Sequence, residues 1–191
     1  VAITNLNRQI IATTETIGKP KVQVMAERIY SINPDAVVNI HQCFFLPENQ
    51  EQFDFTQYDY VVDAVDTVAA KIAIIMAAKE VHTPVISSMG AGNKVNPSMF
   101  EVADIYKTSV DPLARVMRQA MKKRGVKKLK VVYSKEEPLK PLANTAAAQE
   151  APGIRRSLPA SNAFTPSVAG LIIASEVIKD LIDWNPKERK A

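Results

Sequence analysis

The sequence predicts an α/β domain with an open, mostly parallel sheet and helices on both of its faces. Residues 58–66 and 83–89 are apolar runs of strand length, and the stretch between them has apolar residues at helical spacing. Strands that alternate with helices are typical of such a sheet. Ligands of these sheets collect at the carboxyl ends of the strands, where Asp66 and residues 87–92 are expected to lie.

Composition indicates one sizeable domain spanning residues 1–191, because 47% hydrophobic and 23% charged residues are ordinary globular values. The single cysteine, Cys43, excludes an internal disulfide and is typical of a reducing compartment. The most apolar run, residues 168–178, is shorter than the roughly 20 residues of a membrane span. We therefore expect a soluble, cytoplasmic protein without membrane contact.

A basic stretch leads into the first expected helix, with Pro20 in its first turn. Lys19 and Lys21 would lie at the helix N-terminus, where the helix dipole disfavours cations unless an anion binds there. Arg8 would add a planar donor for phosphate or carboxylate. A solvated basic turn explains the same residues equally well. The buried face of this helix is expected to consist of Val22, Met25, Ile29 and Ile32.

Further short elements are expected in the first half of the chain. Residues 36–40 are predicted to form a strand, after which His41 and Cys43 serve packing rather than catalysis. Residues 90–92 are predicted to form a tight turn, because a phosphate loop would need a third glycine and a following helix. Asp66 is either a ligand or the N-cap of the next helix, or both. The apolar face of that helix is expected to consist of Ala69, Ile72, Ala73 and Met76.

The second half of the chain continues the alternation of elements. Strands are predicted at residues 99–105 and 131–133, with a helix at 111–124 between them. Residues 135–164 lack a clear period and are expected to be a long crossover loop, either functional or disordered. Thr165 is expected to cap a final helix. The buried faces of these two helices are expected to be Leu113, Val116, Met117, Ala120 and Met121 in the first, and Val168, Leu171, Ile172, Ile178 and Ile182 in the second.

One helix and the residues after it carry eight cations within sixteen residues, with no acidic residue among them. Such a run is either a solvated face or the contact surface for a polyanion, and its density favours the polyanion. The run consists of Arg115, Arg118, Lys122, Lys123, Arg124, Lys127, Lys128 and Lys130.

Several motifs together give the chain a family resemblance. Asn5-x-x-Arg8-Gln9, Lys21 and Val62-Asp63-Ala-x-Asp66 resemble the nucleotide-site motifs of the ubiquitin-activating-enzyme-like adenylyltransferases, which have a Rossmann-like fold. Within that superfamily the sequence is most similar to the bacterial tRNA threonylcarbamoyladenosine dehydratases. The similarity runs nearly end to end, and it includes Ser88-Met-Gly-Ala-Gly92, Asp111-Pro-Leu-Ala114 and Phe164-x-Pro-Ser-Val-Ala-Gly170.

The resemblance implies a role for each motif residue. Asn5, Arg8 and Lys21 would contact the phosphates of ATP, and Asp66 would hold Mg²⁺, with Arg8 and Asp66 as the catalytic pair. The intact protein would adenylate the carboxylate of threonylcarbamoyladenosine in tRNA and then close a ring on it. The basic run, Lys130 apart, would contact the tRNA. A homodimer and sulfur-relay proteins are the further partners that we expect.

The sequence also differs from the pattern of this family. Family members begin with a strand, a glycine-rich loop, a helix and a second strand, and the sequence lacks this first βαβ unit. We therefore expect an N-terminally incomplete domain that by itself binds ATP weakly and catalyses nothing. Residues 135–164 contain no cysteine, and the sequence has no paired Cys-x-x-Cys motif, which favours a dehydratase. Two alternatives remain: an adenylyltransferase that activates a ubiquitin-like sulfur carrier, and a non-catalytic, dimerising, RNA-binding remnant.

Overall fold

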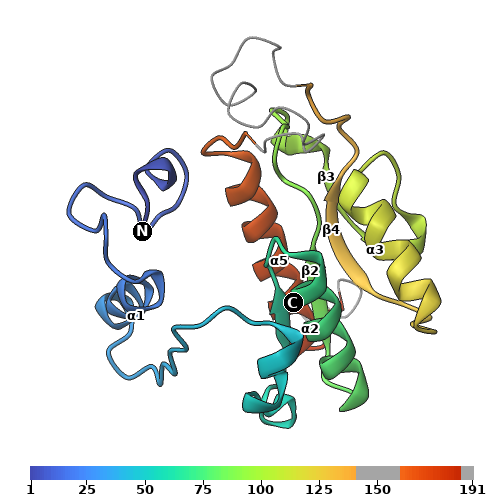
Figure 1. Cartoon of the computed structure of the whole chain (residues 1–191), viewed down its shortest axis with the longest axis horizontal. Coiled ribbons are helices and arrows are strands. Elements are labelled where there is room, and N and C mark those ends of the chain that lie inside the picture. Colours follow the sequence, from blue (N-terminus) through green and yellow to red (C-terminus); the bar gives the residue numbers. More distant parts are fainter. Residues whose placement is uncertain (141–159, 186–191) are drawn as a thin grey trace.

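The computed structural model describes residues 1–140 and 160–185, and its centre is a four-stranded sheet in the order β1-β2-β4-β3 (Figure 1). The strands are β1 (Val61–Asp63), β2 (Val85–Ser88), β3 (Phe100–Asp104) and β4 (Lys130–Ser134). β1, β2 and β4 are parallel, and β3 joins β4 in antiparallel register. This arrangement confirms the mostly parallel sheet that the sequence predicts.

Helices cover both faces of the sheet (Figure 1). α2 (Val68–Glu80) and α3 (Pro112–Lys123) pack on one face, while α5 (Thr165–Leu181) packs on the other. Alternate residues of β4 serve the two faces: Val131 and Tyr133 join the core under α2 and α3, and Val132 joins the core under α5. This alternation is the period of two that a strand imposes on its side chains.

The predicted inner face of α5 is wrong in part. Leu171, Ile178 and Ile182 are 70%, 58% and 62% exposed, whereas Ala169 and Ile173 are buried against the sheet. Apolar residues surround most of this helix, so periodicity does not single out one face. Nor is Thr165 the cap, because the helix begins at that residue. Asn162 Oδ1 accepts hydrogen bonds from the Thr165 N–H (2.8 Å) and its hydroxyl (3.0 Å).

The faces of α2 and α3 also differ from the prediction. α2 is buried nearly all round, including Ala70, Ala77 and Ala78, although Ala69 is exposed. In α3, Val116 is exposed, and Ala114 lies in the core beside Met117 and Met121. The start of α3 at Asp111 and Pro112 agrees with the prediction.

The N-terminal segment and α1 (Lys21–Ile32) stand to one side of the sheet (Figure 1). The predicted buried face of α1 is wrong in part: Val22 and Ile29 are half-buried, but Met25 and Ile32 are exposed. The fully buried residues of this helix are Val24 and Ala26. The strand predicted at residues 36–40 is also wrong, since that stretch has no regular secondary structure and pairs with no described strand. A strand forms only where a neighbouring chain takes up its backbone groups.

The structure also describes the surroundings of the two residues that were expected to serve packing. The ring of His41 lies against Phe53, tilted by 56° with centroids 4.9 Å apart, as a packing role requires. Cys43 is exposed, so the packing role expected for it is wrong. Short 3-10 helices connect the main elements: η1 (Ile3–Asn5), η2 (Pro47–Gln52), η3 (Phe55–Gln57), η4 (Pro97–Met99) and η5 (Ile105–Lys107).

The two ends of the predicted crossover loop meet at Asn93. The Leu139 N–H donates to Asn93 O (2.7 Å), and the Asn93 N–H donates to Ala160 O (2.7 Å). The Ala160 N–H in turn donates to Asn93 Oδ1 (2.6 Å). Residues 141–159, the middle of that loop, lie outside the described residues. Across residues 1–140 and 160–185, none of the helices has the length and apolar character that crossing a bilayer requires.

Candidate nucleotide and RNA site

Asp66 lies in the turn between β1 and α2, at the carboxyl edge of the sheet, and its side chain is exposed. The N-cap of α2 is Thr67 rather than Asp66, which excludes the capping role considered for this carboxylate. Its described hydrogen bond is a long one, 3.4 Å from the Thr67 hydroxyl. The carboxylate therefore remains available to a ligand from solvent.

Asp63 and Lys71 form a fully buried ion pair beneath this turn, with the Lys71 Nζ 3.0 Å from Asp63 Oδ2. The same ammonium donates to the carbonyls of Val65 (3.2 Å) and Ser88 (2.7 Å). The Ser87 hydroxyl donates to Asp63 Oδ2 at 2.5 Å. Burial lowers the pKa of Lys71, and Asp63 beside it opposes that shift.

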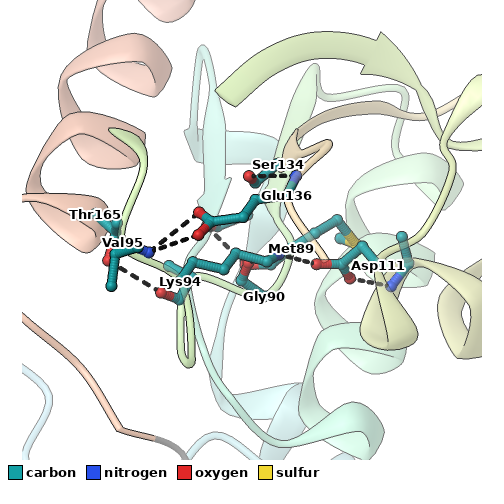
Figure 2. A network of polar contacts seen from close by, with 11 residues as sticks. Met89, Gly90, Lys94, Val95, Asp111, Ser134, Glu136 and Thr165 are labelled. Atoms are coloured by element: carbon teal, nitrogen blue, oxygen red, sulfur yellow. Dashed lines mark hydrogen bonds and ion pairs between the residues drawn. The ribbon is translucent and has the colours of Figure 1, made fainter. Parts of the chain in front are cut away.

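A second buried pair, Lys94 and Asp111, lies beyond the end of β2 (Figure 2). The Lys94 Nζ is 2.5 Å from Asp111 Oδ2 and donates to Gly90 O at 2.6 Å. Asp111 Oδ1 caps α3 by accepting from the Ala114 N–H at 2.7 Å. A Cβ at Gly90 would lie 3.0 Å from Asp111 Oδ2, so the close backbone approach predicted for residues 90–92 is confirmed at this glycine.

Glu136 joins the end of β4 to the loop that follows Lys94 (Figure 2). Its carboxylate accepts from the backbone N–H groups of Val95 (2.9 and 3.1 Å) and Asn96 (2.9 Å). Its own N–H donates to Ser134 Oγ at 3.1 Å. Buried ion pairs and side-chain hydrogen bonds to the backbone thus hold the carboxyl edge of the sheet in place, from β1 across to β4.

The other predicted ATP contacts lie in the N-terminal segment. Asn5 is buried, and its Oδ1 accepts from the Ala2 N–H at 3.0 Å. Arg8 is half-buried and donates through Nη1 to Thr4 O (2.9 Å) and Asn7 Oδ1 (2.8 Å). Lys21 is exposed at the first position of α1.

The structure brings Asn5 and Arg8 together, because the Arg8 N–H donates to Asn5 O at 3.1 Å. Among residues 1–140 and 160–185, no hydrogen bond or ion pair joins Asn5, Arg8 or Lys21 to Asp66. A bond from Asn7 Nδ2 to Ser161 O (2.8 Å) ties this segment to the chain just before α5. Convergence of these residues on one nucleotide stays a prediction.

The basic run extends from α3 to the opposite, amino edge of the sheet. Three members have described bonds within the fold: Arg118 donates to Thr108 O at 2.5 Å, Arg124 donates to Ala120 O at 3.1 Å, and Lys130 pairs with Glu176 and Asp180. The exposed members are Arg115, Lys122, Lys123, Arg124, Lys127 and Lys128. A hollow of about 680 Å³ lies between the ends of α2 and α3, and Lys79, His82 and the acidic Glu80 line it together with part of this run.

Sequence reasoning missed four residues around these sites. Lys79 and His82 lie far along the chain from the basic run that they join. The burial of Lys71 and Lys94 does not follow from the sequence, because lysine is almost never fully buried unless it is paired. One signal was present: Lys71 is the one charged residue of the apolar run 68–78.

Comparisons with known proteins show the family to which the sequence belongs. The sequence model of the ThiF family matches residues 1–191. The tRNA threonylcarbamoyladenosine dehydratase of Bacillus subtilis (strain 168) is 43% identical over 192 residues, covering 95% of this chain and 74% of that protein. The sulfur carrier protein ThiS adenylyltransferase of Escherichia coli (strain K12) is 34% identical over 92 residues, covering 48% of this chain and 36% of that protein.

A solved structure has the same fold. It is the E. coli tRNA N6-threonylcarbamoyladenosine dehydratase, TcdA, in complex with ATP, which superposes with a TM-score of 0.81 at 31% identity. The superposition covers 96% of this chain and 72% of that chain.

Proposed function

Because this chain belongs to the ThiF family, we propose that the protein is an ATP-dependent, adenylate-forming enzyme that dehydrates threonylcarbamoyladenosine in tRNA. The observation that carries this proposal is the 43% identity to a dehydratase of that name, which extends over 95% of the chain. The ATP-bound structure of similar fold supports the choice of nucleotide. The tRNA substrate makes the cytoplasm the compartment that we propose.

The proposed reaction has two steps. The carboxylate oxygen of the modified nucleoside attacks the α-phosphate of ATP and releases pyrophosphate, which leaves a mixed anhydride with AMP. The carbamoyl nitrogen then loses a proton, attacks the activated carbonyl carbon and expels AMP, closing a five-membered ring with net loss of water. Both partners of the second step belong to one side chain, so ring closure needs little beyond activation.

Asn5, Arg8 and Lys21 are the proposed phosphate contacts, because preorganised donors and cations stabilise the charge that develops during adenylation. Arg8 keeps an orientation fixed by Thr4 O and Asn7 Oδ1. Lys21 lies at the N-terminus of α1, where backbone N–H groups also favour an anion.

Asp66 is the proposed Mg²⁺ ligand. Mg²⁺ is usually held by one or two carboxylates together with substrate phosphates and water. The described residues contain no cluster of three or more side chains that could hold a metal ion, so a single exposed carboxylate fits a site that ATP completes. When bound there, Mg²⁺ would neutralise charge on the departing pyrophosphate.

Exchange of labelled pyrophosphate into ATP tests the reaction and separates it from its nearest rival. We expect the full-length protein to support exchange only when tRNA bearing threonylcarbamoyladenosine is present, with a product lighter by one water. The rival is adenylation of a sulfur carrier, which the similarity to the ThiS adenylyltransferase favours. Exchange that depends on a carrier protein and not on tRNA would overturn the dehydratase proposal. A sulfur-relay partner stays a prediction.

The exposed members of the basic run are the proposed contacts to the tRNA backbone. We expect Lys122→Gln, Lys123→Gln and Lys127→Gln together to weaken tRNA binding and to reduce the salt slope by about two to three units, since each lost phosphate contact removes close to one. ATP binding should stay unchanged, because these lysines lie between the end of α3 and the start of β4, at the amino edge of the sheet, whereas Asp66 follows β1 at the carboxyl edge.

The matched control neutralises three exposed cations outside the run, Arg28, Lys107 and Lys140. This variant has the same change in net charge and should keep the salt slope of the unmodified protein. An equal loss of tRNA affinity and salt slope in both variants would show that the run is an ordinary solvated face and would exclude a localised contact surface.

We also propose that the protein forms a homodimer through the outer face of α5. That face exposes Leu171 and Ile178, and Ile182 just beyond the helix is exposed as well, which together form an apolar surface that a partner could cover. A second copy of this chain is the occupant that we propose. Light scattering of the full-length protein should give the dimer mass, and a monomer at high concentration would contradict it.

A further inference from the structure

We propose that Lys71 is a positioning residue that fixes the turn carrying Asp66. This inference rests on the proposed function, because it takes Asp66 as the Mg²⁺ ligand. Lys71 lies in the first turns of α2, directly below that turn, and its side chain is fully buried.

The ammonium of Lys71 has three N–H donors, and three acceptors surround it. They come from the last residue of β1 (Asp63 Oδ2, 3.0 Å), the turn itself (Val65 O, 3.2 Å) and the last residue of β2 (Ser88 O, 2.7 Å). One point charge thus joins two strand ends and the turn between β1 and α2.

The bond to Val65 O is the one that acts on Asp66. That carbonyl belongs to the peptide plane joining Val65 to Asp66, and a peptide unit is planar. Holding the oxygen therefore fixes the orientation of the plane and the direction in which the Asp66 backbone leaves it. The second link is through Asp63, whose Oδ1 accepts from the Val65 N–H at 3.3 Å.

Among the described residues Asp66 forms no hydrogen bond or ion pair with Lys71, although its negative charge, like that of Asp63, raises the pKa of this lysine against the effect of burial. Asp63 is the buried counter-ion of Lys71, and Asp66 lies further out, in solvent. Residues that orient a metal ligand without touching the metal commonly change metal affinity by about 10- to 100-fold when they are substituted.

The chain offers a matched control in Lys94. It is equally buried, is paired to Asp111 and also donates to a backbone carbonyl, that of Gly90. Lys94 makes no described bond to the turn of Asp66. Lys71→Met and Lys94→Met therefore each remove a buried ammonium that is paired with a carboxylate and bonded to a backbone carbonyl. Only the ammonium of Lys71 is bonded to the turn that carries Asp66.

The test measures Mn²⁺ binding to the full-length protein in the presence of ATP, by electron paramagnetic resonance, with Mn²⁺ as the probe for Mg²⁺. We expect Lys71→Met to weaken Mn²⁺ binding by about 10-fold or more. Lys94→Met should lower the unfolding midpoint and leave Mn²⁺ affinity unchanged. Unchanged affinity in Lys71→Met, or an equal loss in both variants, would overturn the proposal.

A second variant covers the case in which Lys71→Met fails to fold. Asp63→Asn with Lys71→Met removes both charges, so it leaves no uncompensated buried charge, which is what destabilises the single variant most. It still releases Val65 O, so it should lose Mn²⁺ affinity to the same extent. Normal affinity in this double variant would contradict the positioning role.

Asp66→Asn separates the failure of this inference from failure of the proposed metal site. If Asp66→Asn keeps full Mn²⁺ affinity, the assignment of Asp66 is wrong, and the role of Lys71 fails with it. If Asp66→Asn loses affinity and Lys71→Met does not, only the role of Lys71 fails.

Discussion

The side chains of Lys94 and Asp111 show how a charged residue can be accommodated inside a small domain. The ammonium has a carboxylate and a carbonyl as partners, and the carboxylate also caps α3. In the part of the chain that the structure describes, no buried side-chain nitrogen or oxygen lacks a hydrogen bond. Such a pair adds little net stability, but removing one partner leaves an uncompensated buried charge.

We expect Lys94→Met to lower the free energy of unfolding by about 3–5 kcal/mol, because Asp111 would stay buried and unpaired. Urea denaturation followed by circular dichroism measures this. The control is Lys135→Met, which breaks a 2.5 Å pair with Glu101 whose side chains are 54% and 37% exposed. An exposed pair of this kind contributes at most about 1 kcal/mol. Similar losses in both variants would contradict the account of burial.

Two glycines give opposite expectations for the same substitution. Gly90→Ala should destabilise by about 1–3 kcal/mol, because the new methyl would lie against a carboxylate that Lys94 and α3 hold in place. Gly170→Ala should stabilise by about 0.5–1 kcal/mol, because it lies within α5 with open space around it. Thermal unfolding of the two variants compares them directly, and a stabilised Gly90→Ala would exclude the close approach.

At the scale of elements, α5 is fastened to the sheet by a cluster of charges at its C-terminal end. Lys130 of β4 pairs with Glu176 (3.3 Å) and Asp180 (2.7 Å), and the Tyr60 hydroxyl donates to Asp180 at 2.7 Å. Burial raises the pKa of Glu176 and of Asp180, but bonds to their lysine and tyrosine partners outweigh it, so that both values end below the ordinary range.

This cluster should make the attachment of α5 sensitive to acid. A carboxyl whose pKa is lower in the folded state stabilises the fold fully above its unfolded pKa, here 4.5 for Glu176 and 3.8 for Asp180. The stabilisation is lost as the pH falls through the lower, folded values. We expect Lys130→Met to be less stable at neutral pH and to show a flatter loss of stability below pH 4.5.

Chemical denaturation at a series of pH values measures that slope. Lys127→Met is the control, because Lys127 is exposed and forms no ion pair within residues 1–140 and 160–185. A slope in Lys130→Met as steep as in the control would show that the cluster does not respond to acid.

The elements differ in how much of them the sequence could predict. The alternation of strands and helices and the start of α3 follow from local patterns, and the structure has them as expected. The inner face of α5 does not follow from a local pattern, because Leu171 and Ile173 are both strongly apolar and only packing against the sheet determines which of them is covered. The strand expected at residues 36–40 fails for a related reason, since local propensity cannot supply the neighbouring strand that pairing needs.

The site shows the same division. Asp66 could be recognised by its place after a strand, whereas the cluster below it could not. The partners of Lys71 come from two separate stretches, residues 63–65 and Ser88, so their meeting depends on the pairing of β1 with β2. A charged residue within an apolar helix was the one local sign of a buried pair.

At the scale of the whole molecule, the exposed face of α5 leads to a prediction about assembly. We expect Ile178→Glu to shift the proposed dimer to monomer, because it would place a charge in the apolar contact. Val116→Glu is the control, since Val116 is an exposed apolar residue of α3, across the sheet. Analytical ultracentrifugation measures the mass of both variants. A dimer that persists in Ile178→Glu would show that the interface does not include this face of α5.

The hydrogen bonds of Asn93 determine where the chain can accept an insertion. Its bonds to Leu139 and Ala160 hold the two ends of the intervening segment together within the folded domain. The entropy of closing a loop rises only with the logarithm of its length, so doubling the segment would cost about 0.6 kcal/mol. A fluorescent reporter or an affinity tag could therefore be inserted between Lys140 and Ala160 while the sheet and its helices still fold.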